Sequence, residues 1–558
     1  LIFGVTRIVN FAHGSFYMVG IYVAYSAVAW IGEGPGYWPA LLVAAVAVGV
    51  VGALVEILLL RRIYHAPELF QLLATFALVL VIKDAALWLW GPQELFGPRA
   101  PGLEGAVDIL GRRFPAYDLF LIAVGPLVLL LLTLLLTRTR WGRLVRAATQ
   151  DREMVGALGV NQAWLFTGVF ALGAALAGLA GALQLPREPA SLELDMLTIG
   201  AAFVVVVVGG MGSLPGAFVA ALLIAELKAL CIWLGVVQIA GVDIAFPKLT
   251  LVVEFLVMAL VLVWRPWGLL GRPQAAVRGV GAPEPPLAGA GPRASAAWIV
   301  LLLALALLPL IVGQGSYAMV LLTDIFIAAL FAASLHFILG PGGLHSFGHA
   351  AYFGLGAYGA ALLTRALGLP MGAVLLLAPL AAAAGALLYG WFCVRLSGVY
   401  LAMLTLAFAQ ITWAIAYQWD ALTGGSNGIT GVWPPDWAAQ GAGFYWLALA
   451  LCAAGVYLLR RMLHAPLGWS LRAARDSALR AEAIGLHGRR VQWAAFVVAG
   501  LLAGLAGALF AFSKGGVAPD ALSVTKSVDG LVMVLLGGMQ QLAGPLVGAA
   551  AFTWLHDS

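Results

Sequence analysis

Charged side chains are scarce in this chain, and several gather in one short segment, "GRLVRAATQDREMVGALGV", residues 142–160. The segment lies between two long apolar runs and combines Arg146, Asp151 and Glu153 with a glycine, Gly159. A helix can end at such a glycine in the left-handed conformation. We therefore expect a compact helical knob that projects from the apolar part of the protein and docks in a groove of a partner.

The sequence has no motif for nucleotide binding and no spacing typical of metal ligands. A P-loop needs Gly-x-x-x-x-Gly-Lys followed by Ser or Thr, and the chain has no Gly-Lys dipeptide. The glycine-rich stretch 340–349 lacks the lysine. The three cysteines, Cys231, Cys393 and Cys452, lie in apolar runs without metal-ligand spacing. We expect no catalytic residue, no metal and no cofactor in this chain.

Ionisable side chains inside apolar runs are costly and often functional. Four lie well inside such runs: Glu226, Lys228, Glu254 and Asp324. Each could line a water-filled route for a solute or could hold two helices together, and Glu254 is taken as the pathway candidate among them. A fifth, Glu56, lies near a basic pair at the end of its run, where we expect it to reach the interface or to pair.

A second group of pathway candidates comes from a repeated pattern. His13 and His349 occupy equivalent places in "NFAHG" and "SFGHA", where we expect a helix to begin after an unwound turn. Free backbone groups of a broken membrane helix can hold the charged groups of a solute. Asn10, His13, Ser346 and His349 are therefore candidates for the pathway, although a histidine there can equally cap its own helix.

The elements that must position these residues are membrane helices. Hydrophobic residues make up 63% of the 558 residues and charged residues 10%, whereas a soluble domain carries about 25% charged residues. A run of about 20 apolar residues spans a bilayer as a helix. The expected fold class is an all-α polytopic membrane protein, since a barrel would show short alternating strands. The long runs include 39–60, 69–90, 118–137, 162–184, 216–236, 248–264, 371–394 and 444–459.

Basic residues indicate the orientation of these runs, because cytoplasmic loops collect Lys and Arg. Counting crossings from the pair Arg61-Arg62 places segment 142–160 in the cytoplasm, in agreement with its own charge. Segments 92–108 and 185–197 carry acidic residues and are expected outside. Short basic loops beside spans do not indicate nucleic-acid binding, and membrane lipid is the expected surrounding.

Three sequence patterns occur twice and in the same order, which indicates a duplication. Residues 142–183 align without a gap with 468–509, and both copies end in "LAGLAGAL". The other pairs are 10–22 with 346–358, and 209–218 with 537–546. We expect two multi-helix transmembrane halves that form a pseudo-dimer with a pathway between them.

A Pro-, Gly- and Ala-rich stretch, residues 271–296, separates the halves and has the composition of a linker. We therefore expect a first half at 1–270 and a second half at 297–558. Both ends look truncated, because the chain begins with Leu1 and stops directly after an apolar stretch. The apolar run at the start also looks too short to cross a membrane.

Several long motifs resemble the permease subunits of branched-chain amino acid ABC importers. These subunits occur as an H-type and an M-type. "LIFGVTRIVNFAHGSFYMVGIYVAY" and "VVVVVGGMGSLPGAF" resemble the H-type, and "GPGGLHSFGHAAYFGLGAYGAALL", "RLSGVYLAMLTLAFAQI" and "RAARDSALRAEAIGL" resemble the M-type. The resemblance covers most of both halves and implies a fusion of the two types.

The resemblance implies a role for the charged segment as the helix that couples the permease to an ATPase. The general pattern there is Glu-Ala-Ala, three residues, Gly, which Glu153 and Gly159 fit. The second copy has Leu479 in place of the glutamate, so we expect the two ATPase contacts to differ. The implied coupling residues are Arg146, Asp151, Glu153, Gly159, Arg472, Asp476, Glu482 and Gly485.

The resemblance also implies partners and a location. Two cytoplasmic ATPase subunits would bind ATP and Mg²⁺, and a solute-binding protein outside would deliver the substrate. "TGGSNG" resembles a family signature, and its Ser426 and Asn427 could touch that receptor or the entering solute. We expect a bacterial inner-membrane permease for branched-chain amino acids. The alternatives are an ABC permease for urea or short amides, an ion-coupled secondary transporter, and a membrane-embedded enzyme.

Overall fold

The computed structural model describes almost the whole chain, and nearly all of it is helical. The described residues are 2, 10–32, 34–64, 66, 68–109, 111–239, 242–271, 291–313, 316–439 and 442–557. Among them, 12 helices are long and apolar enough to cross a membrane. The expected all-α polytopic fold is confirmed.

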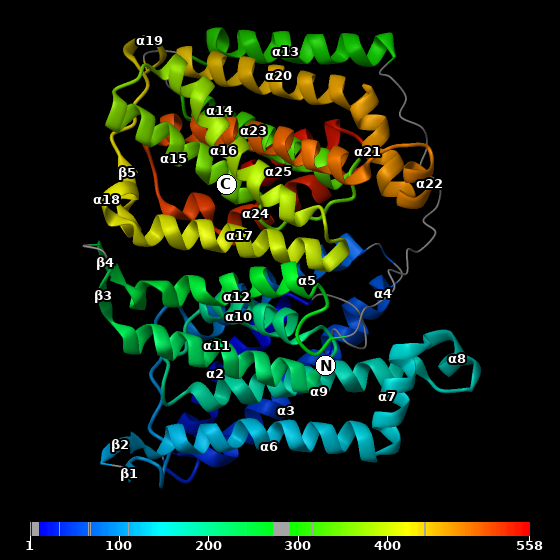
Figure 1. The fold of residues 1–558 in the computed structure, drawn as a ribbon, viewed down its shortest axis with the longest axis vertical. Coiled ribbons are helices and arrows are strands. Elements are labelled where there is room, and N and C mark those ends of the chain that lie inside the picture. Colours follow the sequence, from blue (N-terminus) through cyan, green and yellow to red (C-terminus); the bar gives the residue numbers. More distant parts are fainter. Residues whose placement is uncertain are drawn as a thin grey trace. The chain divides into compact units, whose positions relative to one another are not determined.

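The elements of the first repeat and its flanking segments run from α2 to α12 (Figure 1). They are α2 (Ala12–Ile31), α3 (Tyr37–Val55), the π-helical turn η1 (Glu56–Leu60), α4 (Arg61–Ile63), α5 (Glu68–Trp90), β1 (Ala106–Ile109), β2 (Arg112–Pro115), α6 (Ala116–Arg138), α7 (Arg140–Gln150), α8 (Arg152–Ala157), α9 (Gln162–Gln184), α10 (Leu194–Gly209), α11 (Leu214–Leu234), β3 (Val236–Ile239), β4 (Val242–Ala245), the 3-10 turn η2 (Phe246–Leu249) and α12 (Thr250–Trp264).

The elements of the second repeat run from α13 to α25. They are α13 (Pro292–Val312), α14 (Tyr317–Leu339), α15 (His349–Leu367), α16 (Met371–Cys393), α17 (Gly398–Gln418), α18 (Asp420–Thr423), η3 (Gly425–Asn427), β5 (Ile429–Thr430), α19 (Asp436–Ala439), α20 (Gly443–Leu463), α21 (Pro466–Asp476), α22 (Ala478–Ala483), α23 (Gly488–Lys514), β6 (Gly516–Val517), η4 (Pro519–Leu522), α24 (Val524–Gly537) and α25 (Ala543–Asp557). The strands form three antiparallel pairs, β1 with β2, β3 with β4 and β5 with β6.

The expected apolar runs all fall on helices, but the expectation for the start of the chain is wrong. Helix α2 has 20 residues and is apolar enough to span. Its Gly, Ser and Tyr residues dilute the apolar pattern, yet about half of the helix is buried against other helices. Small and weakly polar residues suit such a buried position, because membrane helices approach each other closely at small side chains.

The chain forms two compact units, residues 1–226 with 267–274 and residues 227–266 with 275–558. Helix α12 belongs to the second unit, where it packs against α17. Most of the predicted linker, residues 272–290, lies outside the described residues. The domain boundaries at 270 and 297 therefore stay predictions.

Each unit has a core of three long helices that cross at glycines. In the first unit α2, α3 and α9 pack together, and in the second α15, α16 and α23 do so. A Cβ atom built on Gly20 would lie 2.3 Å from the carbonyl oxygen of Gly178, and one on Gly356 would lie 2.1 Å from that of Gly504. The repeated "LAGLAGAL" supplies Gly178 and Gly504. The duplication seen in the sequence is thus also a duplication of packing.

Both repeats also contain short helices and non-helical stretches beside the long ones. The chain is not helical between α14 and α15, over residues 340–348. Helices α10 and α24 have only 16 and 14 residues, fewer than the ~20 that cross a bilayer. Each ends at a glycine, Gly209 or Gly537, that touches the backbone of the following helix. These interruptions are the places where backbone groups need partners other than their own helix.

The glycine crossings predict opposite effects for the same small substitution. Gly356→Ala should lower the melting temperature of the detergent-solubilised protein, because the added Cβ collides with α23 and overpacking costs about 1–3 kcal/mol. Gly372→Ala is the matched control, since a Cβ there meets nothing within 4 Å and alanine is the better helix former. Equal melting temperatures for both variants would contradict the close crossing.

Candidate functional site

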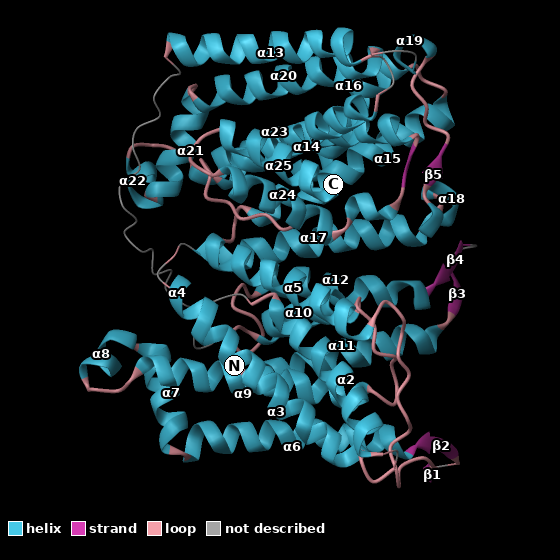
Figure 2. Cartoon of the chain, turned by 180° about the vertical axis from the view of Figure 1, so that it is seen from behind, coloured by secondary structure: helices cyan, strands magenta, loops and turns pink. Residues whose placement is uncertain are grey.

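The charged segment of the first repeat folds into two short helices at one end of the first unit. Helices α7 and α8 lie at the opposite end of α6 from the β1–β2 hairpin (Figures 1 and 2). They have a small core of their own with the start of α9, in which Val145, Val155 and Val169 are buried. The predicted knob is therefore a packed structure and not a loose connector.

The ends of α8 explain two of the predicted residues. The carboxylate of Asp151 accepts a hydrogen bond from the backbone N–H of Met154 at 2.9 Å, which is the contact of an N-cap. Gly159 follows the helix with a φ of 81°, a left-handed conformation that favours glycine. The sequence analysis predicted that the helix ends at Gly159 but did not assign Asp151 as its N-cap.

The second copy has the same design, with a different capping residue. Ser477 caps α22 by accepting from the N–H of Arg480, and Gly485 ends it with a φ of 84°. Leu471 and Ala481 are buried at the positions of Val145 and Val155. In the second unit α21 and α22 lie at the opposite end of its long helices from β5 (Figure 2).

Both helices present apolar side chains to the outside. Met154 and Leu158 are 57% and 75% exposed in the first copy, and Leu479 and Ile484 are 82% and 74% exposed in the second. An exposed apolar cluster on a polar segment is typical of a protein interface. Of the other predicted coupling residues, Arg146, Asp476 and Glu482 are exposed and Arg472 is half-buried, whereas the Glu153 side chain lies outside the described part.

One arginine connects the second docking segment to the interrupted helix. Arg475 of α21 donates to the carbonyl oxygen of Gly340 at 2.7 Å, in the segment between α14 and α15. It also pairs with Asp476 at 2.9 Å. Gly343 has a φ of 62°, and a Cβ there would lie 2.7 Å from the Arg475 side chain. Sequence reasoning missed Arg475, because nothing local marks it among the neighbouring arginines.

The predicted pathway residues Ser346 and His349 lie where the chain passes from this interrupted segment into α15. Both side chains are buried. Nε2 of His349 shares a hydrogen bond of 2.8 Å with the hydroxyl of Ser334. This contact ties the first turn of α15 to α14.

The backbone of the same segment obtains partners from other helices. The hydroxyl of Thr405 in α17 accepts from the N–H of Phe347 at 3.1 Å. That of Ser527 in α24 accepts from the N–H of Ala350 at 2.9 Å. In this structure side-chain hydroxyls thus accept from one N–H group of the segment and one in the first turn of α15, and the expected role of this backbone in holding a solute stays a prediction.

The corresponding residues of the first repeat lie at the start of α2. Asn10 is buried, and its side-chain oxygen accepts from the N–H of Ala12 at 3.1 Å. His13 is partly buried in the first turn of the helix. These contacts fit a helix start, which is the alternative role that the sequence left open.

The remaining pathway candidates lie apart from these two segments. Glu254 pairs with Lys228 at 2.6 Å, and Asp324 pairs with Lys514 at 2.7 Å. Both pairs join one helix to another, which is the role of holding helices together. Ser426 and Asn427 are exposed in η3, next to the β5–β6 pair.

The repeated helical bundle, with 12 helices of membrane length among the described residues, defines the class as a duplicated multi-pass membrane protein. A sequence profile described as "Branched-chain amino acid transport system / permease component" matches residues 1–262 and again 317–558. The chain belongs to this family, and it is a protein of the cytoplasmic membrane.

Curated relatives of both permease types match about half of the chain each. The high-affinity branched-chain amino acid transport system permease protein LivM of Escherichia coli is 32% identical over 43% of this chain and 63% of its own length. BraD of Pseudomonas aeruginosa is 30% identical over 49% and 89%. LivH of Escherichia coli is 27% identical over 49% and 89%. The chain thus spans less than two thirds of the first relative, and matches to both types fit an H–M fusion. No solved structure was found to match.

The cap of the first docking helix predicts a local effect. Asp151→Ala should speed hydrogen exchange of the α8 amides about fivefold, because losing an N-cap costs about 1 kcal/mol. Asp151→Asn keeps the acceptor oxygen and should exchange like the wild type. Mass spectrometry of peptides covering 151–160 measures this. Fast exchange in the asparagine variant as well would show that the carboxylate does more than cap the helix.

Proposed function

We propose that this chain is the membrane-spanning permease of an ATP-driven importer. A solute-binding protein outside delivers the ligand, and two cytoplasmic ATPase subunits dock on α8 and α22. The observation that carries the proposal is the pair of equivalent capped helices with exposed apolar tips. The family of permease components supports it, since each relative is named as part of a transport system.

The free energy for import comes from ATP and Mg²⁺ on the partner subunits. The chain itself has no Gly-Lys dipeptide and hence no P-loop. Movement of a docked ATPase reaches α21 and, through Arg475, the interrupted segment before α15. This segment can then change its contacts with Thr405 and Ser527 and expose backbone groups to the solute.

Branched-chain amino acids are the proposed substrates, because the relatives are named for their transport. An ABC permease for urea or short amides is the nearest alternative, and selectivity lies largely in the separate binding protein. An ion-coupled transporter needs carboxylates that change charge during the cycle. The pairing of Glu254 with Lys228 and of Asp324 with Lys514 disfavours that alternative.

Apolar contact by the docking helices predicts that a charge at either tip weakens ATPase binding. Leu158→Glu and Ile484→Glu should each reduce the affinity of one ATPase about tenfold, as expected for an interface hot spot. Phe96→Glu is the control, because this side chain is 73% exposed on a segment expected outside the cell. Co-purification with each ATPase is the measurement. Equal binding by all three variants would rule out these tips as the contact.

The whole proposal predicts ATP-dependent leucine uptake into proteoliposomes. The permease, both ATPases and the binding protein should all be required, and uptake should persist without an ion gradient. Calorimetry on the binding protein separates leucine from urea and amides. Uptake by the permease alone, driven by a proton gradient, would falsify the ATP-driven mechanism.

A further inference from the structure

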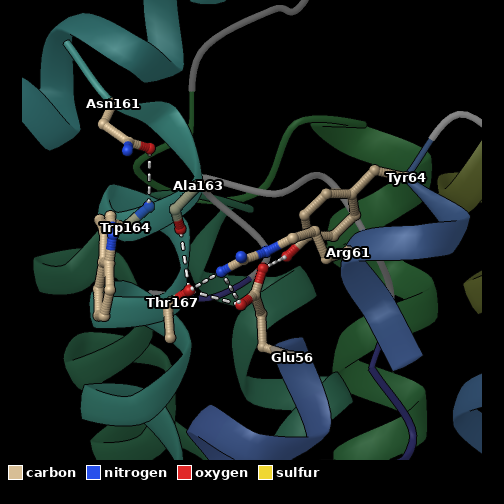
Figure 3. Close-up of polar contacts among 7 residues, drawn as sticks. All are labelled: Glu56, Arg61, Tyr64, Asn161, Ala163, Trp164 and Thr167. Atoms are coloured by element: carbon tan, nitrogen blue, oxygen red, sulfur yellow. Dashed lines mark hydrogen bonds and ion pairs between the residues drawn. The ribbon is translucent and has the colours of Figure 1, made fainter. Parts of the chain in front are cut away.

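A fully buried carboxylate, that of Glu56, lies just after the end of α3 and faces Thr167 of α9 (Figure 3). The side chain of Glu56 is 0% exposed. Arg61 donates to its Oε2 at 3.1 Å and the hydroxyl of Thr167 donates to the same oxygen at 2.5 Å. The hydroxyl of Tyr64 donates to Oε1 at 3.0 Å. We call these four residues the Glu56 cluster.

Thr167 is the member that closes the cluster. Nη2 of Arg61 also donates to the Thr167 hydroxyl oxygen, at 2.7 Å. A hydroxyl has one hydrogen, and a separation of 2.5 Å from a carboxylate oxygen is the length of a charge-assisted bond. Arginine therefore donates to both threonine and glutamate. The threonine hydrogen goes to glutamate, because its other acceptor, the carbonyl oxygen of Ala163, is farther away at 2.9 Å. The three side chains form a closed ring between two helices.

The backbone of α3 is distorted where it enters the cluster. Residues Glu56–Leu60 form the π-helical turn η1. In a regular α-helix, residues five apart lie about 140° apart around the axis. The wider turn brings Glu56 and Arg61 to one face. Single π-helical turns of this kind are frequent at functional sites.

The Glu56 cluster joins the end of α3 to α9, the helix that follows α8, and is linked to α5. Thr167 lies in the second turn of α9, and Asn161, which caps α9, accepts from Trp164 at 3.4 Å (Figure 3). On the other side, Gln71 of α5 donates to the carbonyl oxygens of Tyr64 and Ala66, at 3.2 and 2.8 Å. The cluster thus connects α9, the helix that follows α8 in the chain, with α3 and α5.

The packing of the second repeat identifies the residue that corresponds to Glu56. A Cβ on Gly52 would meet Ala174, and a Cβ on Gly500, the equivalent of Ala174, would meet Ala386. Gly52 therefore corresponds to Ala386. Glu56, four residues after Gly52, corresponds to Gly390.

No carboxylate occupies the place of Glu56 in the second repeat. Arg395 corresponds to Arg61, and its guanidinium lies over the Trp391 ring, 3.6 Å from the centroid. The equivalent of Thr167 is Trp493, and a Cβ on Gly390 would lie 3.1 Å from the Trp493 ring. The indole donates to the carbonyl oxygen of Leu387 at 2.8 Å. A glycine and an indole thus hold the equivalent helices together, so the fold itself does not require the ion pair.

We propose that the Glu56 cluster is a positioning element for the transport cycle, through which the first repeat passes movement of α8 to α3 and α5. The Glu56 carboxylate is buried while the Arg61 side chain is 37% exposed, and an ion pair that buries a carboxylate is a poor source of stability compared with well-packed apolar residues. It does impose one geometry on the groups that it joins, since each donor must meet its acceptor. The inference rests on the proposed function and assigns the first repeat a glutamate–arginine connection, whereas the second repeat has only the arginine, Arg395, at this place.

The test uses the reconstituted complex with both ATPases and the binding protein. Thr167→Val removes only the hydroxyl, and Glu56→Gln removes the charge. Each should raise the number of ATP molecules hydrolysed per leucine imported about threefold to tenfold, the range expected when a coupling residue is lost. Thr167→Ser restores the hydroxyl and should restore the wild-type ratio.

Trp493→Phe is the matched control in the second repeat, and it should leave the ratio unchanged. A ratio that stays at the wild-type value in both Thr167→Val and Glu56→Gln overturns the inference, because uptake and hydrolysis then fall together as for a structural defect. An equal rise in Trp493→Phe also overturns it. If Glu56→Gln does not assemble, Thr167→Val decides the matter. A wild-type complex without ATP-dependent uptake would instead refute the proposed function beneath it.

Discussion

Every backbone N–H and C=O group inside the bilayer needs a partner within the protein, because lipid offers none. Regular helices meet this requirement by themselves. The non-helical segment between α14 and α15 cannot, and it depends on Thr405 for the N–H of Phe347 and on Arg475 for the carbonyl oxygen of Gly340, while Ser527 accepts from Ala350 in the first turn of α15. The interrupted helix is therefore tied to α17, α24 and α21, so that movement of any one of them changes its hydrogen bonds.

The same requirement gives the small residues their importance. Two helices can cross closely only where neither has a side chain, as at Gly20 with Gly178 and at Gly356 with Gly504. These crossings recur in both units, so the duplicated packing has little freedom to vary. The polar contacts, unlike the glycine crossings, differ between the two repeats. The Glu56 cluster has no counterpart at Gly390 and Trp493, and the two docking helices use Asp151 and Ser477 as caps.

Much of the architecture follows from the sequence for physical reasons. Apolar runs of membrane length predict the helices, since a bilayer accepts little else. The aligned copies predict the duplication, and the charged segments with Gly159 and Gly485 predict the docking helices. The role of Asp151 as a cap could also have been read from its position before α8. The prediction that the first apolar run is too short to span is wrong because about half of α2 is buried against other helices, where small and weakly polar residues are tolerated.

The sequence by itself determined the membrane class, the two repeats, the family and the position of the two charged helical segments, because each depends on local composition or on sequence alignment. Only the tertiary structure decided which charges meet. Glu56 and Thr167 are 111 residues apart along the chain, and Lys228 and Glu254 come from different helices. Such pairs depend on how helices cross and rotate against each other. That arrangement is set by packing over many residues, which no short stretch of sequence contains.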